Sequence, residues 1–187
     1  NRAAKRLHNA CIKNQLDTQM LVNRVSSQNY RIKTRLTPRG EVLAKVRSGL
    51  VHALSRRLDP NDPQLRSLGM FHGSLNKRIN KAKPDILNLH WLHNEMCSIR
   101  EIGNLNYPLV WTLHDCWALN GVEHYPSDKH SIKSNEQRTG IRSYALKYLD
   151  RWSRLQKAKH WKTPIQLVAP SNWMKEMVKR DPLLNSW

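Results

Sequence analysis

The side chains in this 187-residue chain that are best placed to do chemistry are His114 and Asp115. They come directly after the segment 109–113, Leu-Val-Trp-Thr-Leu, with no turn residue between them. Apolar and β-branched residues in such a short run are typical of a buried strand. A buried parallel strand that ends in a titratable pair places that pair at the carboxyl edge of a sheet, where open α/β sheets bind ligands.

Two further strand-like segments end in polar groups. Ile-Leu-Asn-Leu at 86–89 is followed by His90 and Trp91, and the segment 165–169 is followed by Pro and then Ser171. If all three segments are parallel strands, their ends converge on one edge. We therefore predict a single binding site there.

Several chemistries are open at this site. A neutral His114 can bind a phosphate or a hydroxyl through one ring nitrogen, and Asp115 can orient the ring. General-base catalysis would also require a substrate hydroxyl within reach. A metal site is an alternative, because His114, Cys116, His124 and His130 are grouped in the sequence. Their spacing matches no standard zinc pattern, so we do not expect a metal.

Other common signatures are missing from the sequence. Neither Ser171 nor Cys116 lies in a nucleophile-elbow motif, and there is no GxGxxG or Walker loop. The three cysteines are odd in number, widely spaced and without a CxxC motif. That pattern argues against a disulfide framework and favours a reducing compartment.

Short apolar strands alternate with helical patterns along the chain. We expect strands near 20–22, 86–89, 109–113 and 165–169, and helices at 1–14, 41–58, 74–81, 95–102, 141–161 and from 172 onward. This alternation predicts an α/β fold, a Rossmann-like parallel sheet with helices on both faces. The polar stretch 115–140 is expected to be a long loop that leaves the same sheet edge as His114.

The helix expected at 41–58 has a clear apolar stripe. The stripe is formed by Leu43, Val46, Leu50, Leu54 and Leu58, with basic residues around it. Our preferred interpretation is a core helix with a solvated basic face. The alternative is a basic amphipathic helix that lies on an anionic membrane.

The chain is strongly basic, with 32 Lys and Arg against 14 Asp and Glu, a formal net charge of +18. Such an excess predicts anionic partners, namely nucleic acid, an anionic membrane surface or phosphorylated substrates. No apolar run approaches the roughly 18 residues that a membrane span requires. The basic residues are spread through every expected helix without a known nucleic-acid-binding signature, so nucleic acid is the less favoured partner.

Four segments carry a family resemblance. Residues 1–10, 84–91 (Pro-Asp-Ile-Leu-Asn-Leu-His-Trp), 111–118 (Trp-Thr-Leu-His-Asp-Cys-Trp-Ala) and 168–173 (Val-Ala-Pro-Ser-Asn-Trp) are similar, in this order, to landmarks of bacterial family 4 glycosyltransferases. The resemblance implies a GT-B enzyme made of two Rossmann-like domains. In that arrangement the amino-terminal domain binds the acceptor and the carboxyl-terminal domain binds a nucleotide-sugar donor. Transfer would retain the anomeric configuration without a metal cofactor.

The resemblance also implies roles for particular residues. The family histidine near the donor sugar and pyrophosphate corresponds to His114, and the strand end at His90 and Trp91 would line the acceptor side. We therefore predict the following site residues: His114 and Asp115 as catalytic, and His90, Trp91, Trp117 and Ser171 as substrate-binding.

The sequence departs from the family pattern at both ends. The family's first strand and glycine-rich loop would precede Asn1, and the donor domain with its paired glutamates has no counterpart. We therefore expect residues 1–187 to be the acceptor-binding half of a larger enzyme, inactive alone.

The leading expectation is an enzyme of surface polysaccharide assembly. It would be cytoplasmic, act on a saccharide or lipid-linked acceptor, and associate peripherally with the inner face of the plasma membrane. The competing hypotheses are a basic nucleic-acid-binding protein and a non-catalytic α/β module that docks on a membrane or partner.

Overall fold

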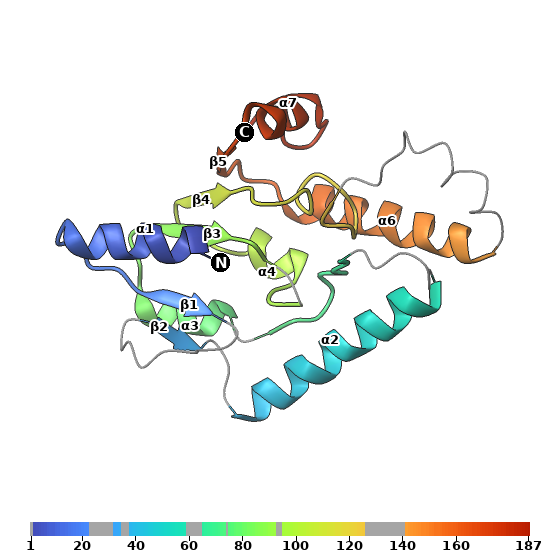
Figure 1. Ribbon diagram of the computed structural model, residues 1–187, viewed down its shortest axis with the longest axis horizontal. Coiled ribbons are helices and arrows are strands. Elements are labelled where there is room, and N and C mark those ends of the chain that lie inside the picture. The colour runs from blue at the N-terminus through green and yellow to red at the C-terminus, as the bar shows by residue number, and fades with distance from the viewer. Residues whose placement is uncertain are drawn as a thin grey trace.

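A computed structural model describes residues 2–22, 32–34, 38–58, 65–73, 75–92, 95–125 and 141–187 (Figure 1). The strands are β1 (Met20–Val22), β2 (Ile32–Thr34), β3 (Leu87–His90), β4 (Leu109–Thr112) and β5 (Gln166–Val168). The helices are α1 (Arg2–Lys13), α2 (Pro38–Leu58), α3 (Leu75–Ala82), α4 (Ile99–Gly103), α6 (Ile141–His160) and α7 (Asn172–Arg180).

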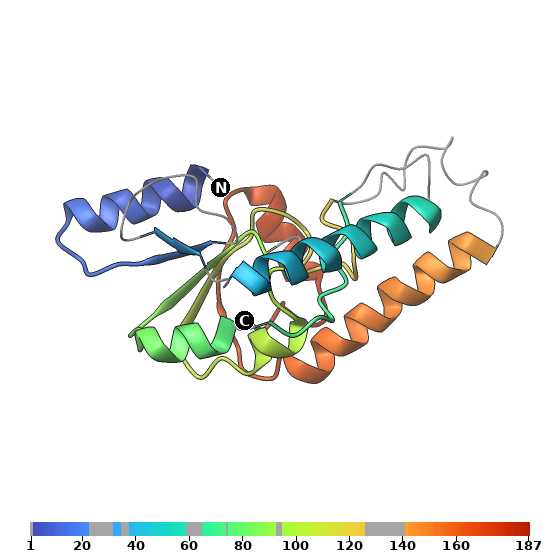
Figure 2. The same ribbon diagram turned by 90° about the horizontal axis from the view of Figure 1, so that it is seen from below.

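The centre of the fold is a parallel three-stranded sheet in the order β3-β4-β5. Its register aligns His90 with Thr112 and Thr112 with Val168, so all three strands end at nearly the same level. Helices α3, α4 and α6 lie on one side of these strands and α1 on the other (Figure 2). The predicted α/β class with a Rossmann-like parallel sheet flanked by helices is confirmed.

Two predictions about the elements are wrong. We expected β1 in the main sheet, but it pairs in parallel with β2 in a separate two-stranded sheet. Strand β2 was not expected, because its three residues, Ile-Lys-Thr, lie within a polar stretch. The helix expected to start at Glu95 begins only at Ile99, where Ser98 forms a capping box with Glu101.

The core is built around three tryptophans that contact one another. Trp111 of β4 packs against Trp117 and Trp161, with ring centroids 6.3 and 5.3 Å away, and Trp117 and Trp161 are 6.1 Å apart. The indole N–H of Trp117 donates a hydrogen bond to the backbone carbonyl of Ser67, and that of Trp161 donates to the carbonyl of Ile99. Large aromatic rings with satisfied polar atoms give the sheet a rigid support on this face.

Gly103 permits the close packing of α4 on the end of α6. A Cβ atom at this position would lie 2.3 Å from the carbonyl oxygen of His160, which no side chain tolerates. Glycine at position 103 therefore lets α4 approach the last turn of α6 closely.

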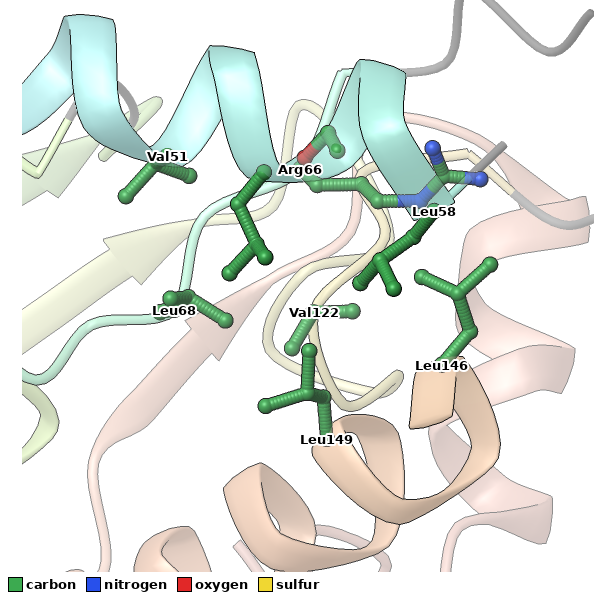
Figure 3. A pocket seen from close by; sticks show the side chains of 9 residues that line it. Val51, Leu58, Arg66, Leu68, Val122, Leu146 and Leu149 are labelled. Atoms are coloured by element: carbon green, nitrogen blue, oxygen red, sulfur yellow. The ribbon is translucent and has the colours of Figure 1, made fainter. Parts of the chain in front are cut away.

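Helix α2 packs differently from the prediction. Of the expected core stripe, Leu43, Val46, Leu50 and Leu54 are exposed, whereas Val51, outside the stripe, is buried. Val51 belongs to a small second core with Leu68 and Val122, separate from the tryptophan core. The crevice beside it is lined by mainly aliphatic residues of α2, α6 and the intervening loops: Val51, Leu54, Ser55, Leu58, Arg66, Leu68, Val122, Leu146 and Leu149 (Figure 3).

The described part of the predicted loop, 115–125, is compact. Its backbone bonds to the segment 65–67 through Ser67 N–H to Val122 O and His124 N–H to Leu65 O, at 2.9 and 3.1 Å. Because the loop is closed against this segment, the residues after His114 pack inward. The rest of the predicted loop, including His130, lies outside the described residues.

Candidate functional site

Two histidines meet at the carboxyl edge of the three-stranded sheet. His90 is the last residue of β3, and His114 follows β4 after Leu113, whose N–H bonds to Val168 O at 3.0 Å. Neighbouring parallel strands that end together bring the two side chains side by side, and Nδ1 of His90 lies 2.9 Å from Nε2 of His114. The sequence predicted both residues at this edge but not their direct contact.

Burial makes both rings harder to protonate. It is the main cause that lowers the pKa of His90, and the nearby His114 adds to it. Burial also lowers the pKa of His114, although the Asp115 carboxylate acts in the opposite direction. Both imidazoles are therefore neutral at pH 7, with nitrogens able to accept as well as donate.

Trp91 and Ser171, two of the predicted substrate-binding residues, lie beyond the ends of β3 and β5. Trp91 is half-buried and has a positive φ of 35°, a backbone conformation that residues other than glycine rarely adopt. Such local strain is typical of functional sites. Ser171 is exposed and caps α7, its hydroxyl accepting from Met174 N–H at 3.1 Å.

Asp115 points away from His114 and into the protein. One carboxylate oxygen accepts from the backbone N–H of Trp117 at 3.0 Å, and the other accepts from Nδ1 of His124 at 2.7 Å. The side chain is buried, with 9% exposure. In this arrangement Asp115 fixes the turn that follows His114, and its oxygens are already engaged.

The partner of Asp115 extends this network to a serine. Nε2 of His124 lies 2.9 Å from the hydroxyl of Ser67, so Ser67, His124 and Asp115 follow the order and spacing of a nucleophilic triad. However, His124 has 0% and Ser67 2% exposure, so no substrate reaches the hydroxyl. The network is structural and ties the segment 65–68 to the loop after His114.

Trp117, another predicted substrate-binding residue, lies in the core with 2% exposure. The ammonium group of Lys157 lies 4.3 Å from the centroid of its ring. The same group donates to the backbone carbonyls of Trp117, Asn120 and Gly121. Burial lowers the pKa of Lys157 well below its ordinary value, and the nearby Arg154 adds to this. Trp117 and Lys157 thus stabilise the loop after His114 from its buried side.

A buried glutamate holds the neighbouring segment. The carboxylate of Glu95 accepts from the backbone N–H groups of Leu68 and Gly69, at 2.7 and 3.1 Å. Burial raises the pKa of Glu95, an effect that these hydrogen bonds partly offset. Sequence reasoning missed Glu95, Ser67 and Lys157, because each acts on residues more than twenty positions away.

The positions of these side chains bear on the two alternative chemistries, a metal site and a Cys116 nucleophile. Among the residues that the structure describes, no three His, Cys, Asp or Glu side chains are grouped to hold a metal ion. His124 and His114, which the metal hypothesis grouped, are directed to Asp115 and His90 respectively. Burial and the Asp115 carboxylate raise the pKa of the Cys116 thiol to about 11, so this group stays protonated at neutral pH.

A parallel three-stranded sheet flanked by helices defines a Rossmann-like α/β domain, and its polar candidate site lies beyond the strand ends, where such sheets bind ligands. The family model described as Glycosyltransferase Family 4 matches residues 18–183, nearly the whole chain. The chain therefore belongs to glycosyltransferase family 4, as the resemblance of its motifs indicated. No curated protein and no solved structure matches the chain.

Proposed function

We propose that this chain is the acceptor-binding half of a GT-B glycosyltransferase. The enzyme would transfer a hexose, with retention and without a metal, from a nucleotide sugar to a saccharide acceptor in surface polysaccharide synthesis. The observation that carries the proposal is the pair His90–His114 at the carboxyl edge of the sheet, in a chain that belongs to this family.

The site residues divide into two groups in this proposal. His114, whose Nδ1 has no hydrogen-bond partner among the described residues, faces the donor sugar and its diphosphate, while His90 and Trp91 line the acceptor side. Asp115 and Trp117 act from within: Asp115 fixes the turn after His114 and Trp117 supports it. Ser171 lies exposed at the start of α7, at the third strand end of the same edge.

The test is sugar transfer by the complete polypeptide, followed with a labelled nucleotide sugar and a lipid-linked saccharide. His114→Ala should lower kcat by about 10²-fold or more, the range of a positioned proton-transfer group. The matched control is His72→Ala, because His72 is an exposed histidine in the loop before α3. Transfer at the wild-type rate by His114→Ala would refute the proposed role.

We further propose that the protein works on an anionic membrane through α2, which would favour a lipid-linked acceptor on the cytoplasmic side. Four exposed apolar residues, Val42, Val46, Leu50 and Leu54, recur at spacings of four along this helix. Exposed basic residues, Lys45, Arg56 and Arg57, accompany them. No helix in the described ranges is long and apolar enough to cross a membrane. An exposed apolar stripe with flanking basic residues is the composition of an interfacial helix.

Vesicle sedimentation tests this surface. The wild-type chain should bind vesicles with anionic lipid and not neutral ones, since each Lys or Arg near an anionic surface contributes about 1 kcal/mol. The double variant Val46→Glu/Leu50→Glu should lose binding. Asn106→Glu/Asn185→Glu is the control, because it changes the net charge equally at exposed positions elsewhere. Tight binding to single-stranded DNA without lipid preference would instead favour the nucleic-acid hypothesis.

A further inference from the structure

The two histidine rings at the sheet edge meet edge to edge. Their planes are inclined by only 25°, and their centroids are 5.2 Å apart while Nδ1 of His90 and Nε2 of His114 are 2.9 Å apart. The centroid separation is the N···N distance plus one ring radius on each side. The two nitrogens therefore lie on the line between the ring centres, and the hydrogen bond lies nearly in the plane of both rings, which is its strongest geometry.

The contact couples the protons of the two rings. A neutral imidazole has one N–H and one acceptor nitrogen, so one ring donates in the bridge and the other accepts. If His114 donates from Nε2, its outer Nδ1 is an acceptor and the outer Nε2 of His90 carries a proton. If His90 donates, both assignments are reversed. In either state the two outer nitrogens present one donor and one acceptor.

The outer nitrogens are available to a ligand. Within the described part of the chain, neither ring makes a second hydrogen bond, and neither outer nitrogen is among the buried polar atoms that lack a partner. Among the described side chains, the Asp115 carboxylate is a charged group that acts on the pair, and it opposes the lowering of the pKa of His114. Asp115 itself is turned away and bonded to His124, so it does not block the outer face of His114.

We propose that His90 and His114 form a single proton-transfer unit between the acceptor hydroxyl and the leaving diphosphate. This role rests on the proposed glycosyl transfer. One outer nitrogen takes the proton of the acceptor hydroxyl, the bridging proton crosses from one ring to the other, and the opposite outer nitrogen releases its proton to the diphosphate oxygen. The acceptor oxygen forms the new bond to the sugar carbon, and the electron pair of the broken bond stays on the diphosphate. The rings exchange tautomers and remain neutral.

The coupling of His90 and His114 can be tested without a substrate. In the chain labelled with ¹⁵N-histidine, a coupling across the bridge should join Nδ1 of His90 to Nε2 of His114. Both rings should titrate together and take up one shared proton, at a pH below the ordinary histidine pKa of 6.5. His90→Gln should abolish the coupling, whereas His72→Gln should leave it unchanged. Two independent titrations without a coupling would overturn the proposal.

Kinetics of the complete polypeptide then separate proton transfer from mere positioning. A glutamine at position 90 can still hydrogen-bond to His114 but cannot pass a proton on. His90→Gln should therefore lower kcat by about 10²-fold with KM nearly unchanged, and should alter the pH profile of kcat. Wild-type kcat in this variant would overturn the relay while leaving glycosyl transfer in place. A coupled pair in a wild-type polypeptide that transfers no sugar would overturn the proposed function and the role of the pair with it.

Discussion

Replacing Asp115 with alanine should destabilise the chain strongly, although this residue follows the candidate catalytic histidine. The carboxylate of Asp115 is the acceptor for two buried groups, the N–H of Trp117 at 3.0 Å and Nδ1 of His124 at 2.7 Å. Alanine removes both acceptors and offers nothing in their place. His124 has 0% exposure, so water cannot substitute without a rearrangement of the loop.

The size of the effect follows from these two contacts. A buried donor that loses its acceptor costs about 1–3 kcal/mol, so two such losses amount to about 2–6 kcal/mol. For a chain of this length, 1 kcal/mol corresponds to about 2–4 °C, so Tm should fall by roughly 5–20 °C. Asp115→Asn should cost about 1–2 kcal/mol, because the amide oxygen still accepts from Trp117 and the ring of His124 can change tautomer.

Urea unfolding of the 187-residue chain, followed by tryptophan fluorescence, measures these differences. The matched control is Asp85→Ala, because Asp85 is exposed ahead of β3, and its change should stay within about 0.5 kcal/mol. If Asp115→Ala were no more destabilising than Asp85→Ala, the carboxylate would not be holding the turn. The inward role assigned to Asp115 would then be wrong.

Three further predictions concern the supports of the site. Lys157→Met should cost about 3 kcal/mol in urea unfolding, because it removes the donor from the buried Trp117 carbonyl and one donor each from the carbonyls of Asn120 and Gly121. Exposed Lys159→Met should be neutral. Because its pKa is raised, Glu95 binds a proton more tightly in the folded state than in the unfolded state. The free energy of unfolding should therefore fall as the pH rises above about 4.5 and through the raised pKa. Glu95→Gln should make this pH dependence flatter. Gly69→Ala should lower Tm in a thermal melt, because Gly69 has a φ of +63° and an added Cβ would lie 2.9 Å from the side chains of Ile99 and Trp117. An unchanged Tm would show that alanine fits this position without strain.

The strand ends illustrate how much of the site is predictable from the sequence. Short apolar runs that lead into His90 and His114 indicated parallel strands, and parallel strands must place their ends at one edge. The direct contact of the two rings was not predictable, because it depends on the register that aligns His90 with Thr112. A shift of one residue would turn one of the two side chains to the other face of the sheet.

For helix α2 the sequence pattern was clear, but its packing was not predictable. Its apolar stripe was evident in the sequence, but periodicity indicates only that a face is apolar and not what covers it. The structure buries Val51 and leaves Leu43, Val46 and Leu50 exposed, because the loop residues that α2 packs against meet only one flank of the helix.

The sequence by itself determined the α/β class, the sheet edge at which the candidate site lies and the family to which the chain belongs, because these depend on local patterns and their order. The tertiary structure alone decided which polar side chains meet at that edge and which turn into the core. It joined His90 to His114, turned Asp115 inward to His124 and placed Trp117 over Lys157. These pairings join residues up to forty positions apart, and whether a side chain faces water or the core depends on neighbours that only the folded chain brings together.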